Sequence, residues 1–234
     1  MMKKLSIPLF ICICLMLGVE TASAQIGVKG GVNYSKFIGS DAQSAENITG
    51  LNVGATFRLF GIGPVSIHPE IYYSEKGTRF SDQLRTFMDG ESADLDPAQP
   101  PENIDLEFNL AYVEVPIMLK IALPFLGGDV IEPFIKGGPV FAWRIDCNFS
   151  LQSAEEFSVS ECADQNFPDL NTTFENADRG FAAGGGLDFK IPVLGTLILE
   201  GRYVRGLSRL LKDGENSDIQ NQNFTIMAGF TLGF

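Results

Sequence analysis

Basic residues are scarce in this chain, and their scarcity excludes one class of partner. The sequence has 17 lysine and arginine residues against 29 aspartate and glutamate residues, so its formal net charge is −12. Proteins that bind nucleic acid need a basic face toward the phosphate backbone. We therefore predict that the chain does not bind nucleic acid.

Long apolar runs are absent after the first 24 residues. A membrane-spanning helix needs about 20 consecutive apolar residues, so no such helix is expected there. Before that point, two lysines precede an apolar run over residues 5–19, and Ala22-Ser23-Ala24 offers a cleavage site of small residues. This order is typical of a secretory signal peptide. We predict that residues 1–24 are a cleaved signal and that residues 25–234 form one exported domain.

Cysteine is also rare, with four in the chain and only Cys147 and Cys162 after the predicted signal. Both lie in one long polar segment that we expect to face an oxidising compartment. Two cysteines in such a compartment form a disulfide more often than a metal site. We predict a disulfide between Cys147 and Cys162.

Period-two alternation of apolar and polar residues is abundant, and this pattern predicts β-strands. Leu106, Phe108 and Leu110 have the opposite parity to the apolar residues that follow them. We expect either a bulge near Leu110 or a hairpin that extends beyond the membrane. The predicted strands are 26–37, 50–60, 65–80, 105–123, 131–146, 179–191, 196–208 and 223–234.

The connections between these strands alternate between long and short along the chain. Barrels of the outer membrane have long external loops and short periplasmic turns, and closure leaves no unpaired edge in lipid. The sequence therefore predicts an all-β fold, an eight-stranded antiparallel up-and-down transmembrane β-barrel. Outward aromatic residues at two heights fit the two girdles of such a barrel. They are Tyr34, Tyr73, Trp143 and Tyr203 toward the loops and Phe57, Phe189 and Phe234 toward the turns.

Charged residues fall on the face of the strands that we expect to point inward. A lysine or arginine facing lipid at mid-depth would cost about 2–4 kcal/mol, whereas charges of both signs can pair in a polar interior. An eight-stranded barrel is just wide enough for side chains to fill, so we predict a plug of paired charges. A pore lined for selectivity is the alternative. The residues are Lys29, Arg58, His68, Glu70, Glu114, Lys120, Lys136, Arg144, Asp188, Lys190, Glu200 and Arg202.

Ser66, His68 and Glu70 share one face of a strand and suggest a catalytic triad. Residues two apart on a strand are separated by about 6.6 Å, which we take as too far for a direct hydrogen bond between nucleophile and base. We therefore predict no catalytic residues, cofactor or metal. The acidic loops suggest a solvated exterior rather than a calcium site, because Asp94 and Asp96 lack the rest of a calcium loop.

Five motifs together resemble those of a known family. His68–Gly77 resembles a PEL-Y-S-x-KG strand, Tyr112–Pro116 resembles Y-x-E-x-P, and Glu132–Pro139 resembles PY-x-x-x-GP. Gly184–Phe189 and Glu200–Tyr203 complete the set. In this order they are similar to the PorT-like family of outer-membrane β-barrel proteins, often labelled "porin family".

The resemblance implies insertion into the outer membrane of a gram-negative bacterium by the barrel-assembly machinery, with Phe234 as the C-terminal aromatic signal. Some members of the family assist protein secretion. We predict a non-enzymatic barrel that acts in envelope structure, adhesion, or a secretion or uptake complex. Its expected partners are outer-membrane lipid, lipopolysaccharide and an envelope or secretion protein. The alternatives are a narrow channel and a soluble lipocalin-like carrier, whose interior would be apolar.

Overall fold

The computed structural model of the protein describes residues 25–39, 42, 45–81, 105–152, 157–161, 175–210 and 219–232. The predicted signal peptide, Cys162, Phe234 and most of the acidic loop residues lie outside the described residues. Among the described residues, no helix is long and apolar enough to cross a membrane.

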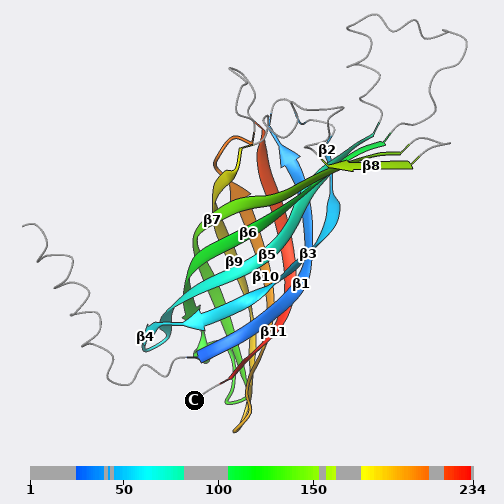
Figure 1. Cartoon of the computed structure of the whole chain (residues 1–234). Helices are drawn as coiled ribbons and strands as arrows, with labels where there is room; N and C mark the ends of the chain where they lie inside the picture. The colour runs from blue at the N-terminus through cyan, green and yellow to red at the C-terminus, as the bar shows by residue number, and fades with distance from the viewer. Residues whose placement is uncertain are drawn as a thin grey trace, which may run out of the picture.

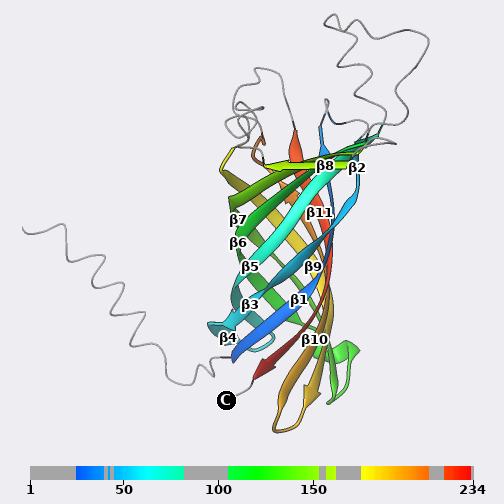
Figure 2. The same ribbon diagram turned by 45° about the vertical axis from the view of Figure 1, so that its right-hand side comes forward.

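Long antiparallel strands form a closed barrel, which confirms the predicted fold (Figure 1, Figure 2). Each long strand pairs with the next long strand along the chain, and the first, β1 (Gln25–Ile38), pairs with the last, β11 (Gln220–Leu232), through 13 residue pairs. The long strands are β1 (Gln25–Ile38), β3 (Ile48–Arg58), β5 (Val65–Ser81), β6 (Asp105–Ala122), β7 (Ile131–Gln152), β9 (Ala177–Ile191), β10 (Gly195–Gly206) and β11 (Gln220–Leu232). Short elements extend the ends: β2 (Ala45–Glu46) and β4 (Phe60–Ile62) on β5, β8 (Phe157–Glu161) on β7, and a 3-10 turn, η1 (Pro124–Leu126).

Alternation along each strand separates an apolar outer face from a polar inner face. On β1, Val28 is 65% exposed whereas the adjacent Lys29 is 4% exposed. The same alternation places Trp143 and Tyr203 on the outer surface. An apolar outer surface around a polar interior is the arrangement of a barrel in lipid, and it is the reverse of the apolar interior expected of a lipocalin-like carrier.

The two ends of the barrel differ in the length of their connections. Short connections follow β4, β6 and β9, and they lie together at the lower end of Figure 1. We call this the turn end, and we call the opposite end, where the long connections begin, the loop end. Because outer-membrane barrels place short turns in the periplasm, the loop end faces the cell exterior.

The irregularity expected near Leu110 is present, but the extra residue is on the neighbouring strand. The β6–β7 register passes from Ala111 opposite Asp146 to Tyr112 opposite Arg144, so the additional residue is Ile145 of β7. The extended hairpin of the alternative expectation is also present, because β6–β7 pairing continues to Gln152 whereas β7–β9 pairing ends at Trp143. Its extension beyond the membrane stays a prediction. The extended sheet is visible at the loop end in Figure 1.

The apolar residues at the start of β6 have a structural explanation that the sequence pattern did not reveal. Leu110 and Tyr112 share the inward parity and are each 1% exposed. They belong to an apolar cluster inside the loop end, and Leu106 and Phe108 pack against it. The inner face is therefore polar at mid-barrel and apolar near the loop end. The buried members of this cluster are Phe37, Ala42, Leu110, Tyr112, Ala142, Cys147, Phe149 and Leu210.

Cys147 is buried in this cluster. Its predicted disulfide partner, Cys162, lies outside the described residues, so the disulfide stays a prediction. Asn148 and Glu161, which adjoin the two cysteines in sequence, are opposite each other in the β7–β8 register.

Candidate functional site

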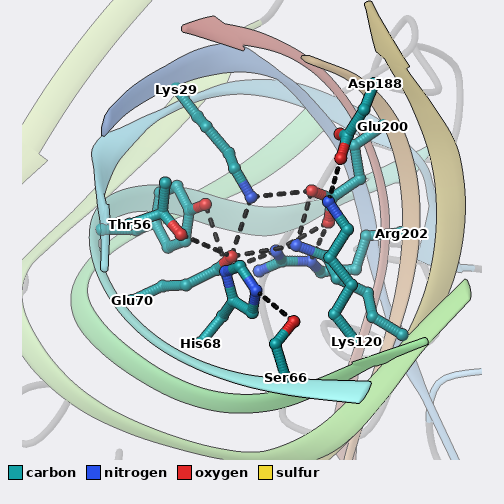
Figure 3. A network of polar contacts seen from close by, with 11 residues as sticks. Lys29, Thr56, Ser66, His68, Glu70, Lys120, Asp188, Glu200 and Arg202 are labelled. Carbon is teal, nitrogen blue, oxygen red and sulfur yellow. Dashed lines mark hydrogen bonds and ion pairs between the residues drawn. The ribbon is translucent and has the colours of Figure 1, made fainter. Parts of the chain in front are cut away.

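Five charged side chains meet at the centre of the barrel. Lys29 comes from β1, Glu70 from β5, Lys136 from β7, and Glu200 and Arg202 from β10. Period-two alternation turns each of them inward, and their side chains are 0–4% exposed. We call these five residues the central cluster; all but Lys136 are labelled in Figure 3.

Glu70 is the most heavily contacted carboxylate of the central cluster. Its Oε1 accepts hydrogen bonds from Lys29 at 2.8 Å, Lys136 at 2.9 Å and the Thr56 hydroxyl at 3.3 Å, and its Oε2 accepts from the Tyr72 hydroxyl at 3.1 Å and from Arg202. These donors come from β1, β3, β5, β7 and β10. One carboxylate therefore links strands on opposite sides of the barrel.

Glu200 completes the cluster. Its Oε2 lies 2.8 Å from the Lys29 ammonium and 2.6 Å from the Lys136 ammonium. Its Oε1 accepts hydrogen bonds from Nε and Nη2 of Arg202 at 2.9 and 2.7 Å. Two carboxylates thus meet three cations, so the central cluster has a formal charge of +1.

Further ion pairs lie inside the barrel on both sides of the central cluster. Lys76 pairs with Glu114 toward the loop end. Lys120 pairs with Asp188 toward the turn end, and the Lys120 ammonium lies 4.0 Å from the centre of the Phe134 ring. Lys190 pairs with Glu132 at the turn-end opening at 2.7 Å.

Two of the predicted interior charges lie apart from these pairs. Arg58 is half-buried and lines the opening of the turn end. Arg144 lies near the loop end, where its guanidinium donates a hydrogen bond to Asn176 Oδ1 at 3.0 Å. All twelve residues of the predicted set have inward parity, but the central cluster contains only five of them.

His68 contradicts the geometric argument made from strand spacing. Its Nε2 lies 2.9 Å from Ser66 Oγ, so the two side chains are hydrogen-bonded despite being two residues apart (Figure 3). The backbone rise overestimated the separation because the long imidazole side chain leans along the strand. The Glu70 oxygens bond to cluster residues, Thr56 and Tyr72 instead of His68. Among the described residues, the third contact that a triad requires is therefore not formed.

Sequence reasoning left some interior residues out of the predicted set. Lys76 shares the parity of Glu70, and that parity was the signal that could have included it.

An uncharged layer lies inside the barrel on the loop-end side of the central cluster, and it is built around Asn33, which is 0% exposed. Amides and hydroxyls at these positions do not stand out in a search for charges. The layer consists of Asn33, Asn52, Ser74, Asn223 and Thr225.

Open space inside the barrel is present at the turn end. A cavity of about 580 Å³ opens there and is lined by Arg58, Ser66, Lys120 and Lys190 among others. A smaller cavity of about 40 Å³ extends from it to Lys29 and Lys136 of the central cluster. No group of three side chains suited to hold a metal ion occurs among the described residues.

A family model matches most of the chain. The sequence matches the family model for an outer membrane protein beta-barrel domain over residues 20–212. No curated protein matches the chain.

Several solved structures are similar at low sequence identity. The attachment invasion locus protein Ail of Yersinia pestis is 12% identical, with a TM-score of 0.43 over 90% of this chain and 99% of that chain. Neisserial surface protein A is 10% identical, with a TM-score of 0.44 over 89% and 97%. OprG of Pseudomonas aeruginosa is 9% identical, with a TM-score of 0.39 over 91% and 97%.

Proposed function

The chain belongs to the outer membrane protein beta-barrel domain family, and on this premise we propose that it is a closed, non-enzymatic barrel that acts through its extracellular side. Its role is in envelope structure, in adhesion, or in assisting a secretion or uptake complex. The PorT-like motifs favour the last of these, because some PorT-like proteins assist secretion.

The central cluster is the observation that carries this proposal. Its side chains join β1, β5, β7 and β10 across the barrel axis and are almost inaccessible to solvent. A solute would have to break several buried, charge-assisted hydrogen bonds to pass this level. The apolar cluster at the loop end adds a second obstruction. The barrel therefore acts as a membrane anchor for the surfaces outside it.

A narrow channel is the second candidate function, and the turn-end cavity favours it. The cavity of about 580 Å³ admits small solutes from the periplasmic side. The smaller cavity continues inward from it, and Lys29 and Lys136 line that smaller cavity. Conduction would then require the central cluster to separate.

Copurification from detergent-solubilised outer membrane tests the proposed role. In one variant, residues 82–104 and 163–174 are replaced by short glycine–serine linkers. We expect an envelope protein to copurify with the wild-type chain and to be lost from this variant. The matched control is Lys190→Gln at the turn end, which should retain the partner. If the linker variant and the wild type copurify the same proteins, the role does not lie in the extracellular segments.

A further inference from the structure

Apart from Arg58 at the turn end and Arg144, which donates to Asn176, four basic residues of the described chain lie outside its ion pairs, and all four lie at the loop end. Lys36, Arg179, Arg205 and Arg209 form no ion pair with another described residue. Arg179, Arg205 and Arg209 are exposed, and Lys36 is half-buried. In a chain with a net charge of −12, this grouping of unpaired cations is unexpected.

Strand register places three of these cations side by side on the outer surface. Lys36 of β1 and Arg205 of β10 are both opposite Gln222 of β11. Neighbouring strands are about 4.8 Å apart, so the backbones of Lys36 and Arg205 are about 10 Å apart. Arg205 is also opposite Phe181 of β9, and Arg179 lies two residues from Phe181 on the same face. We call Lys36, Arg179 and Arg205 the basic row.

An aromatic row lies directly beneath the basic row. Tyr34 is opposite Phe224, and Phe224 is opposite Tyr203, on the same three strands. Each of these aromatic residues is 39–45% exposed on the outer face. They lie two residues closer to the turn end, which corresponds to about 6.8 Å. Outward aromatic residues mark the level of the lipid headgroups, so the basic row lies at or just above that level.

On the strands that carry the basic row, and on β11 between them, no carboxylate of the described residues has outward parity. Within the described strands β1, β9, β10 and β11, the residues of outward parity are apolar, aromatic, small, amide or basic. By contrast, β5 carries the outward-facing Glu75, whose carboxylate accepts a hydrogen bond from the Tyr73 hydroxyl at 3.0 Å. Among the described strands, the outward-facing cations without an ion pair therefore lie on β1, β9 and β10, whereas Arg79 on β5 is paired with Glu107.

We propose that the basic row binds the phosphate groups of lipopolysaccharide in the outer leaflet. The loop end faces the cell exterior, and the row is at the depth where the phosphates of this glycolipid lie. Two arginines offer planar donors that suit phosphate, and a lysine adds a third positive charge. Acyl chains of the same molecule would lie along the aromatic row and the apolar surface below it. The site does not depend on whether the barrel conducts.

Binding of the bis-phosphorylated glycolipid anchor of lipopolysaccharide to the full mature chain in detergent micelles tests this site. The triple variant Lys36→Gln, Arg179→Gln, Arg205→Gln removes three charges, each contributing about fivefold to affinity near an anionic lipid surface. We expect each single variant to bind about fivefold more weakly and the triple variant about 100-fold more weakly. The control, Arg58→Gln, removes an unpaired arginine at the turn end and should bind like the wild type.

Two further probes identify the ligand chemistry. The dephosphorylated glycolipid should bind the wild-type chain about as weakly as the bis-phosphorylated form binds the triple variant. Phosphatidylglycerol should compete only weakly. The proposal is overturned if the triple variant binds within twofold of the wild type, if Arg58→Gln causes the same loss, or if phosphatidylglycerol competes equally well. Trp143 fluorescence establishes that each variant is folded before binding is measured.

Discussion

Glu70→Gln is expected to lower the free energy of unfolding by about 3–5 kcal/mol, as removal of one partner from a buried ion pair does. Glu70 accepts hydrogen bonds from three cations and two hydroxyls. The amide would remove a negative charge from a cluster that already has an excess positive charge. Three buried cations would then share the single carboxylate of Glu200.

The same charge count predicts that removal of a cation from the central cluster costs less stability than removal of a carboxylate. Lys136→Met leaves two cations, Lys29 and Arg202, with two carboxylates, so the remaining charges balance. Removal of one partner from a buried ion pair is costly because it leaves a buried charge uncompensated, and Lys136→Met leaves none. We therefore expect Lys136→Met to change the free energy of unfolding by less than about 1 kcal/mol, far less than Glu70→Gln does.

Urea unfolding in lipid vesicles measures both effects. Trp143 is the only tryptophan and is 50% exposed on the outer surface, so its fluorescence reports insertion into lipid. Glu132→Gln is the matched control, because it breaks a partly exposed pair at the turn end whose loss should cost about 0–1 kcal/mol. Equal losses for Glu70→Gln and Glu132→Gln would show that the central cluster does not hold the barrel together.

Gly31→Ala is expected to have the second large effect, because it obstructs the seam that closes the barrel. A Cβ atom at Gly31 would lie 1.9 Å from the carbonyl oxygen of Ile226 and 2.7 Å from the Cα of Met227. Both atoms belong to the backbone of β11, so a rotamer change cannot relieve the contact. Separating β1 from β11 should cost about 3 kcal/mol or more and reduce the yield of folded barrel.

Gly30→Ala is a control from the adjacent position. Its Cβ would face outward, 3.9 Å from Val53 Cγ2, which is an ordinary contact. We expect this variant to fold with the wild-type yield, measured by Trp143 fluorescence after refolding in lipid vesicles. If Gly31→Ala refolds as completely as Gly30→Ala, the close approach of β1 and β11 does not limit closure.

Strand patterning was enough to predict the barrel and the direction of most side chains. Lys29 and Val28 illustrate why, because a period of two fixes which of them faces lipid once one face is apolar. Closure was predicted because an open sheet would leave an unpaired edge in lipid, and the structure confirms it through the pairing of β1 with β11, which includes Val32 opposite Ile226.

Contacts between distant strands could not be predicted in this way. Lys29 meets Glu200 across 171 residues of sequence, and this meeting depends on the stagger and tilt of the strands rather than on parity. The position of the irregularity near Leu110 was predicted, but its assignment to β7 depends on pairing. The Ser66–His68 hydrogen bond was excluded from backbone rise alone, whereas side-chain lean decides it.

Planar-bilayer conductance tests most directly whether the barrel is closed. The central cluster predicts that the purified chain of residues 25–234, inserted at neutral pH, shows no stable openings. Glu70→Gln, if it inserts, should show intermittent openings because it loosens the central cluster. Discrete, long-lived openings of the wild-type chain, at a conductance unchanged by Glu70→Gln, would contradict the closed barrel and favour the channel.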